Sequence, residues 1–326
     1  MRRRTFLRGI AASTAWPIAA RADKTRLIGV LSSYAESDRA AQSEVAVFRG
    51  GLAKLGWTEG SNLRIELRWG NADPNRIRTL AKELIDLRPD VILSPTTLVT
   101  GTLARETRTI PIVFVNVADP IGSGFAASLA RPGGNITGFT VETPAQGGKW
   151  VELLKEIAPR TVRMALLFNP ATAVPLQFFM PSSQAAASSH AVQISNAPVH
   201  AKDEIEGVIA AQARDPGGGL IVMPDSFHVV NRELIIALAA RYGVPAIYWN
   251  RFFTESGGLI TYGTDFVEQF RQVPEYIDRI LKGEKPADLP IQAPTKFELV
   301  INLKTAKTLN LDVPPLLLGR ADEVIE

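Results

Sequence analysis

The stretch Leu27-Ile-Gly-Val-Leu31, followed by the segment Ala41–Leu55, indicates the fold class of this chain. The first is a run without a polar side chain, typical of a strand buried on both faces of a sheet. The second carries apolar side chains every three or four residues, typical of an amphipathic helix, and Gly56 follows as its stop. A buried strand followed by an amphipathic helix predicts the repeating unit of a parallel α/β sheet.

The same alternation continues through most of the chain. Further strands are expected at 63–69, 91–93, 112–115, 136–139, 164–168, 192–194, 220–223, 246–248 and 259–262. Helices are expected at 75–87, 100–107, 122–130, 145–157, 176–188, 203–213, 232–242 and 266–281, with a small strand and helix in 297–309. Because the rhythm restarts after Thr143, each half holds about five strands, the size of one doubly wound parallel-sheet domain.

The N-terminal 22 residues have the form of an export signal. Arg3-Arg4-Thr5-Phe6-Leu7-Arg8 fits a twin-arginine motif, and Gly9–Ala20 is an apolar run of 12 residues. A membrane-spanning helix needs about 20 apolar residues, so this run is too short to span. Ala20-Arg-Ala22 offers small residues to signal peptidase, which predicts cleavage before Asp23. We expect export in the folded state; a basic N-terminus on a cytosolic protein is the alternative.

Composition narrows the function classes. The whole chain has 36 basic and 33 acidic residues, but five arginines lie in 1–22; removing them leaves 31 basic against 33 acidic, net −2. The mature chain therefore gives no charge argument for nucleic-acid binding. It has no cysteine, which excludes disulfides and thiolate metal sites. No later apolar run approaches spanning length, so we expect the mature chain not to be embedded in a membrane.

Polar and aromatic residues cluster directly after the predicted strands. In open parallel sheets a ligand binds in the crevice at the carboxyl ends of the strands, so these residues are the candidates for a binding site. They are Ser32, Ser33, Tyr34, Thr96, Thr97, Asn116, Asp119, Asn169, Asp225, Tyr248 and Trp249. Helix capping explains Ser32, Thr97 and Asn169 equally well, because Ser, Thr and Asn cap helices whatever the function.

Motifs for catalysis are scarce. The three histidines, at 190, 200 and 228, show no metal-ligand spacing, and neither a Gly-x-Ser-x-Gly elbow nor a phosphate-binding loop is present. Gly122-Ser-Gly-Phe-Ala-Ala127 loosely matches a dinucleotide fingerprint, but it follows the fourth strand, and we interpret it as a turn entering a helix. We therefore predict no enzyme activity, no cofactor and no metal, although nothing in the sequence excludes a catalytic carboxylate pair.

Three long segments carry a family resemblance: Phe48-Arg-Gly-Gly-Leu-Ala-Lys-Leu-Gly56, Ser128-Leu-Ala-Arg-Pro-Gly-Gly-Asn-Ile-Thr-Gly138 and Pro294–Lys307. In these the chain resembles the tryptophan/tyrosine-type solute-binding components of bacterial ABC importers. The resemblance implies the type I periplasmic-binding-protein fold, with two α/β lobes joined by a three-strand hinge. It also implies a small ligand enclosed between the closing lobes.

The resemblance further implies a division of the chain and of the site. It assigns 1–22 to the signal, 23–140 plus 263–285 to the first lobe, and 141–262 plus 286–326 to the second. Ser32, Thr96, Thr97 and Asp119 would serve the first lobe. Asn169, Asp225, Tyr248 and Trp249 would serve the second. The crossings are expected near 138–143, 262–263 and 283–290.

The expected function is that of a periplasmic, monomeric solute-binding protein that passes a small molecule to a transmembrane permease. If the ligand is an amino acid, Asp119 or Asp225 is expected to pair with its ammonium group, and Thr96-Thr97 or Ser32-Ser33 to hold its carboxylate. Tyr34, Tyr248 and Trp249 would form apolar walls. A periplasmic sensor with the same fold is the alternative, and an exported hydrolase is a third.

Overall fold

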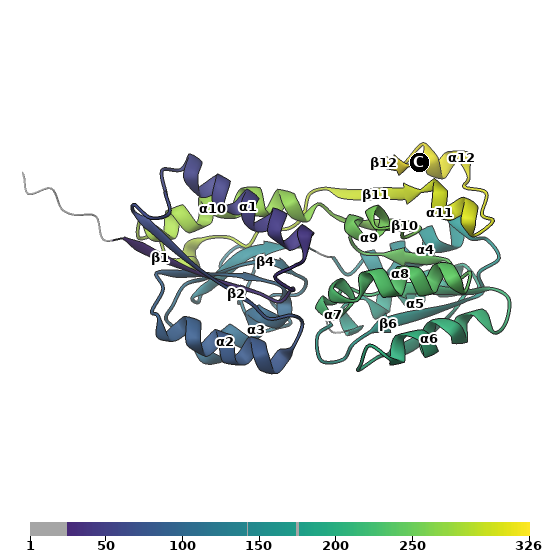
Figure 1. Ribbon diagram of the computed structural model, residues 1–326, viewed down its shortest axis with the longest axis horizontal. Coiled ribbons are helices and arrows are strands. Elements are labelled where there is room, and N and C mark those ends of the chain that lie inside the picture. The colour runs from purple at the N-terminus through teal and green to yellow at the C-terminus, as the bar shows by residue number, and fades with distance from the viewer. Residues whose placement is uncertain (1–24, 142, 174–175) are drawn as a thin grey trace, which may run out of the picture.

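The computed structural model describes residues 25–141, 143–173 and 176–326, which form two α/β lobes lying side by side along the long axis of the molecule (Figure 1). The predicted export signal and its cleavage before Asp23 lie outside the described residues. None of the helices within the described ranges combines the length and the apolarity that crossing a bilayer requires.

The first lobe is built on a five-stranded parallel sheet of order β2-β1-β3-β4-β5. Its strands are β1 (Arg26–Ser32), β2 (Leu63–Trp69), β3 (Val91–Pro95), β4 (Ile112–Val117) and β5 (Ile136–Thr140). One face packs against α1 (Arg39–Lys54) and α10 (Phe266–Leu281), the other against α2 (Pro74–Asp86) and α3 (Thr97–Glu106). Each helix buries its apolar stripe on the sheet, which is the main source of stability for a helix in water.

Residues distant in sequence meet in this lobe where α10 returns from the second lobe to pack on α1. A Cβ at Gly51 would lie 2.5 Å from Cγ of Pro274, so only glycine allows the two helices to approach this closely. Phe48 and Leu52 of α1 and Phe270 and Val273 of α10 share one buried cluster. The C-terminal part of the chain therefore completes the N-terminal lobe.

The second lobe has a seven-stranded sheet of order β12-β11-β10-β9-β8-β6-β7, in which β11 runs antiparallel to β10. Its strands are β6 (Arg163–Phe168), β7 (Gln193–Pro198), β8 (Gly218–Val222), β9 (Ala246–Tyr248), β10 (Ile260–Thr264), β11 (Phe297–Asn302) and β12 (Glu323–Ile325). Its helices are α4 (Gln146–Ile157), α5 (Met180–Ser189), α6 (Glu204–Ala213), α7 (Ser226–Val230), α8 (Arg232–Arg241), α9 (Arg251–Glu255), α11 (Leu303–Thr308) and α12 (Pro315–Leu318), with a 3₁₀ turn η1 (Leu176–Phe178).

The helix expected at 122–130 is wrong. Turns occupy this stretch, in which Asp119 Oδ1 accepts a hydrogen bond from Gly122 N at 2.8 Å and Gly124 has a φ of 72°. A residue in this left-handed region interrupts the hydrogen-bonding pattern of a right-handed helix. The helix expected at 176–188 is divided into η1 and α5.

The chain crosses between the lobes three times, and the crossing strands are bonded to one another. Thr140 N donates to Gln292 O at 2.8 Å, and Thr264 Oγ1 donates to Val141 O at 2.9 Å. The 3₁₀ turn η2 (Pro286–Asp288) and the residues after it pack on the first lobe, where Thr137 Oγ1 donates to Leu289 O at 2.7 Å. Residues 289–292 thus bond to the first lobe, and residues 263 and 264 belong to β10 in the second sheet.

Candidate functional site

A small cavity lies between the lobes at the carboxyl ends of their strands. It is lined by Tyr34, Thr96, Thr97, Leu98, Asn116 and Phe266 from the side of the first lobe and by Thr172, Pro224, Asp225, Ser226 and Trp249 from the second. The space that the centre of a water molecule can reach in it is about 30 Å³. Six of the residues expected from the sequence line it: Tyr34, Thr96, Thr97, Asn116, Asp225 and Trp249.

Asn116 lies in an unusual backbone conformation at this cavity. Its φ is 57°, and the pairing of β4 with β5 shifts register between Phe114 and Val117. Both side-chain polar atoms, Nδ2 and Oδ1, are buried without a hydrogen-bond partner among the described residues. Its backbone N donates to Gln269 Oε1 at 3.1 Å, which holds the residue in place. A strained residue with an unpartnered carboxamide can both donate to and accept from a bound molecule.

Thr96 and the first turn of α3 form the next part of the wall. Thr96 has a φ of 92°, and its side chain does not cap the helix. Instead its Oγ1 donates to Ser33 Oγ at 3.3 Å. The first backbone N–H groups of α3, at Thr97 and Leu98, therefore stand at the cavity without a side-chain cap. The N-terminus of a helix carries partial positive charge and favours an anion.

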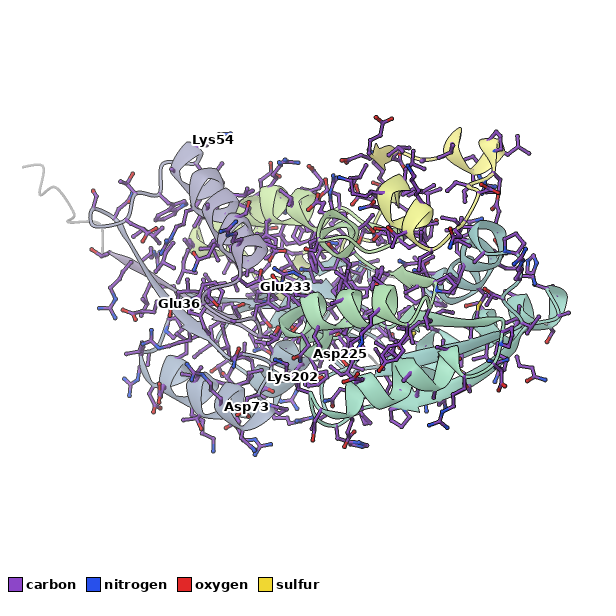
Figure 2. All side chains as sticks on the ribbon, turned by 45° about the vertical axis from the view of Figure 1, so that its right-hand side comes forward. Glu36, Lys54, Asp73, Lys202, Asp225 and Glu233 are labelled. Atoms are coloured by element: carbon purple, nitrogen blue, oxygen red, sulfur yellow. The ribbon has the colours of Figure 1, made fainter. Side chains whose placement is uncertain are left out.

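Asp225, labelled in Figure 2, is held rigidly in the second lobe. Its Oδ1 accepts from Thr172 Oγ1 at 2.5 Å and from Phe227 N at 2.8 Å, and its Oδ2 accepts from Asn169 N at 2.7 Å. Burial raises the pKa of the Asp225 carboxyl, although nearby His228 opposes this. Burial lowers the pKa of His228, whose Nε2 lies 4.0 Å from Asp225 Oδ2. A cationic group in the cavity would favour the charged form of Asp225.

Trp249 supplies an aromatic wall with a polar edge. Its ring packs against Phe266 with ring centroids 5.2 Å apart and edge-on against Phe252 at 6.0 Å. The indole Nε1 is buried without a hydrogen-bond partner among the described residues. Because an indole N–H is only a donor, it can serve an acceptor on a molecule in the cavity.

Two side-chain contacts join the lobes beside the cavity. Ser226 Oγ at the start of α7 donates to Ser33 Oγ of the first lobe at 3.0 Å. Arg232 at the start of α8 forms an ion pair with Asp38, which also caps α1. Both contacts exist only while the lobes are together, so the structure has a closed arrangement.

Other expected site residues lie away from the cavity wall. Ser32 Oγ accepts from Tyr34 N at 3.2 Å, and Asn169 Oδ1 accepts from Ala171 N at 2.9 Å, so both brace the loops beside the site. Asp119 bonds its own turn. Tyr248 is 1% exposed and stacks on Phe253 at 5.0 Å, and burial raises the pKa of its hydroxyl. Asp119 and Tyr248 are therefore not among the residues that line this cavity.

Four lining residues were not expected from the sequence: Leu98, Thr172, Pro224 and Phe266. Ser226 directly follows Asp225 in the polar segment after its strand, but it was not among the predicted site residues. Leu98 directly follows the predicted Thr97. Phe266 begins α10 and reaches the site only because the chain crosses the hinge there. Within the described ranges, no three His, Asp or Glu side chains gather where they could share a metal ion.

Comparison with known proteins fits this two-lobed architecture. A family model described as ABC transporter substrate binding protein matches residues 34–325. The chain belongs to this family. A tyrosine-binding protein of Clostridioides difficile is 23% identical over 260 residues, which cover 80% of this chain and 74% of that protein.

Two solved structures share the fold of this substrate-binding protein. An ABC domain from Streptococcus pneumoniae in complex with L-Trp superposes with a TM-score of 0.83, at 24% identity over 93% of this chain and all of that one. A conserved domain protein of Vibrio cholerae gives 0.84, at 26% identity over 92% of this chain and all of that one. The expected fold class, two parallel-sheet lobes of the type I periplasmic-binding-protein kind, is confirmed.

Proposed function

We propose that this protein is the periplasmic solute-binding component of an ABC importer, which captures an amino acid or a small aromatic compound between its lobes. The observation that carries this is the pair of unpartnered groups at one cavity, the Asn116 carboxamide on one lobe and the Trp249 indole N–H on the other. An unsatisfied buried polar group costs about 1–3 kcal/mol, so a ligand that bonds to both would stabilise the closed arrangement.

The wall chemistry suits an amino acid. The first backbone N–H groups of α3 and the side-chain NH₂ group of Asn116 would hold a carboxylate. The Asp225 carboxylate, on the opposite lobe, would face an ammonium group, and Trp249 and Phe266 would contact the apolar atoms next to these two charged groups. The tyrosine named for the Clostridioides relative and the L-Trp in the Streptococcus complex support this class.

Capture requires the lobes to move. Ligand pockets usually measure about 300–1,000 Å³, far more than the space found here. The Ser33–Ser226 and Asp38–Arg232 contacts would therefore separate to admit a ligand and form again in a widened closed state. We propose residues 25–140 with 265–292 and residues 143–264 with 297–326 as the two moving domains. A ligand that touches both favours closure.

The cellular role follows from this chemistry and from the N-terminus. We propose export by the twin-arginine route with cleavage before Asp23, a monomeric mature chain in the periplasm, and a transmembrane permease that receives the loaded, closed form.

The test is thermal unfolding of residues 23–326 against amino acids, sugars, polyamines and aromatic acids, with recovery of each compound measured afterwards. A ligand at 100 times its Kd adds about 2.7 kcal/mol of stability. We expect a saturable shift with an amino acid or aromatic acid that is recovered unchanged. Asp225→Asn should reduce the shift, whereas Asp119→Asn, away from the cavity, should not. Turnover of a compound, or no shift with any, would contradict the proposal.

A further inference from the structure

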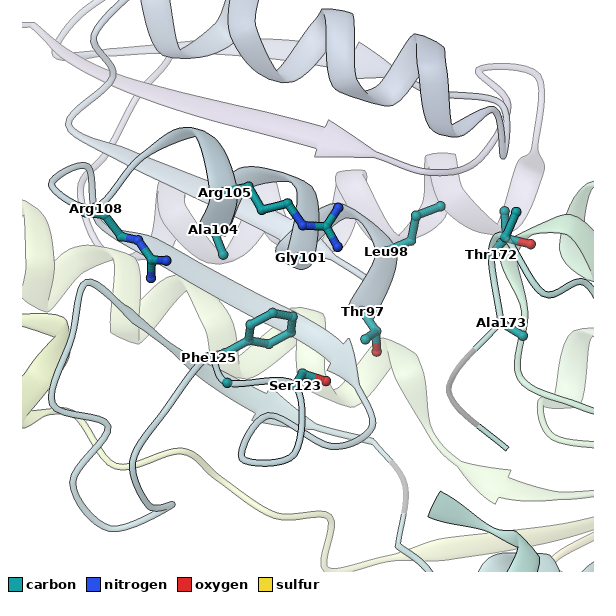
Figure 3. Close-up of a pocket in the computed structure, with 12 residues that line it drawn as sticks. Thr97, Leu98, Gly101, Ala104, Arg105, Arg108, Ser123, Phe125, Thr172 and Ala173 are labelled. Atoms are coloured by element: carbon teal, nitrogen blue, oxygen red, sulfur yellow. The ribbon is translucent and has the colours of Figure 1, made fainter. Parts of the chain in front are cut away.

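A second, larger hollow lies beside the cavity, along α3 (Figure 3). We call it the α3 groove. It shares Thr97, Leu98 and Thr172 with the cavity, and the space open to the centre of a water molecule is about 360 Å³. The first lobe supplies α3 and Phe125, and the second lobe closes it with Thr172 and Ala173. The two hollows are therefore neighbours.

One face of α3 forms the floor of the groove. Thr97, Gly101 and Arg105 are spaced four residues apart, so all three lie on the same face of the helix. A Cβ at Gly101 would lie 3.5 Å from the Phe125 ring, so the ring rests against the helix at this small residue. Figure 3 shows the Arg105 side chain running back along α3 toward Leu98. Along α3 the floor of the groove thus begins at the uncapped N-terminus of the helix, continues as an apolar section at Gly101 and Phe125, and ends at the guanidinium group of Arg105.

The groove has unbalanced positive charge. Arg105 and Arg108 line it, both are exposed, and neither has an ion pair with a described residue. No Asp or Glu is among the described residues that line it. Arg105 also lies in the last turn of α3, where a cation favours the helix, but Arg108 lies beyond the helix end. Arginine binds carboxylate and phosphate groups through two parallel N–H bonds.

We infer that the α3 groove is a subsite for an acidic group at the far end of the ligand. The inference rests on the proposed function, because it places the amino-acid part of the ligand in the cavity. From Thr97 to Arg105 the helix rises about 12 Å at 1.5 Å per residue, and the Arg105 side chain shortens this span. The ligand class is therefore an aromatic amino acid whose ring carries a carboxylate or a phosphate, with the ring along Gly101 and Phe125.

Two matched pairs of compounds test this inference: tyrosine with O-phosphotyrosine, and phenylalanine with 4-carboxyphenylalanine. Calorimetric titration at low salt measures the ratio of the two Kd values within each pair. We expect the acidic member to bind at least tenfold more tightly. Arg105→Gln combined with Arg108→Gln should bring the ratio close to one. Arg214→Gln, an exposed arginine on the second lobe without an ion pair to a described residue, removes one positive charge elsewhere and should leave the ratio unchanged.

The outcomes separate this inference from the proposed function. If the parent amino acids bind but the acidic members bind no more tightly, the subsite is refuted and the proposed function stands. A double variant that keeps the full ratio refutes the subsite in the same way. If no member of either pair binds, the proposed aromatic amino-acid class and the subsite both fail. Ligand-free unfolding temperatures of the variants show whether the helix remains intact.

Discussion

The carboxyl of Glu44 should make the stability of the protein fall with pH between about 4.5 and 8. Glu44 lies on α1 and is 4% exposed, beside a hollow between the lobes that Arg39 and Arg232 also line. Burial, with a contribution from Asp38, raises its pKa from 4.5 to about 8. The folded state therefore binds this proton more tightly than the unfolded state, so the contribution to stability is fully present below pH 4.5 and is lost as pH rises toward 8.

The size of the effect follows from the pKa difference. One pKa unit corresponds to about 1.36 kcal/mol, so the loss is about 3 kcal/mol at pH 7 and about 5 kcal/mol above pH 9. Glu44→Gln keeps the shape of the side chain and removes the titration. We expect the variant to match the wild type near pH 4.5 and to be more stable by about 3 kcal/mol at pH 7.

Urea unfolding at pH 5, 7 and 9 measures this difference directly. Glu83→Gln, on the exposed face of α2, is the matched control for the loss of one carboxylate. A constant free-energy difference between Glu44→Gln and the wild type across this pH range would contradict the prediction, because the Glu44 carboxyl would then titrate alike in the folded and unfolded states.

Three further predictions concern the site. Asp38→Asn keeps the cap of α1 but breaks the ion pair with Arg232, so the lobes of the ligand-free protein should open. Small-angle X-ray scattering would detect the opening as a larger radius of gyration, and an unchanged radius would contradict this prediction. Trp249→Phe removes the unpartnered N–H, so the Kd for the bound amino acid should rise about tenfold; equal affinity by calorimetry would contradict this. Thr96→Gly relieves the strain of a backbone φ of 92° and should stabilise the ligand-free protein by about 1 kcal/mol, measured by urea unfolding. A loss of stability would show that the contacts of the Thr96 side chain contribute more to stability than the backbone strain costs.

The sequence predicts the framework of this fold because apolar periodicity is a local property. The apolar run that begins at Leu27 and the apolar stripe of α1 can be identified in the sequence without any tertiary information. Helices α7 and α9 were not predicted, since five residues are too few to show a period of 3.6. The expected helix at 122–130 failed because its glycines favour a turn that Asp119 closes.

The site was predictable only as far as strand ends indicate it. Position after a strand identified Asp225 and Trp249, but it says nothing of which way a side chain faces, so Tyr248 was included although it lies in the core. The strained conformations of Thr96 and Asn116 have no signal in the sequence, because neither residue is glycine. Phe266 lines the cavity only because the chain crosses between the lobes just before it, and such a crossing is a feature of the tertiary structure.

Calorimetric titration of L-tyrosine and L-tryptophan into residues 23–326, in the wild type and in Asn116→Ala, tests whether this cavity binds an amino acid. Asn310→Ala is the control, since Asn310 also has a positive φ, 52°, but is exposed and far from the cavity lining. We expect one saturable site in the wild type and in Asn310→Ala, with a binding free energy of about −8 kcal/mol for micromolar affinity, and binding at least tenfold weaker in Asn116→Ala. Equal affinity in all three proteins, or no binding of either amino acid, would contradict it.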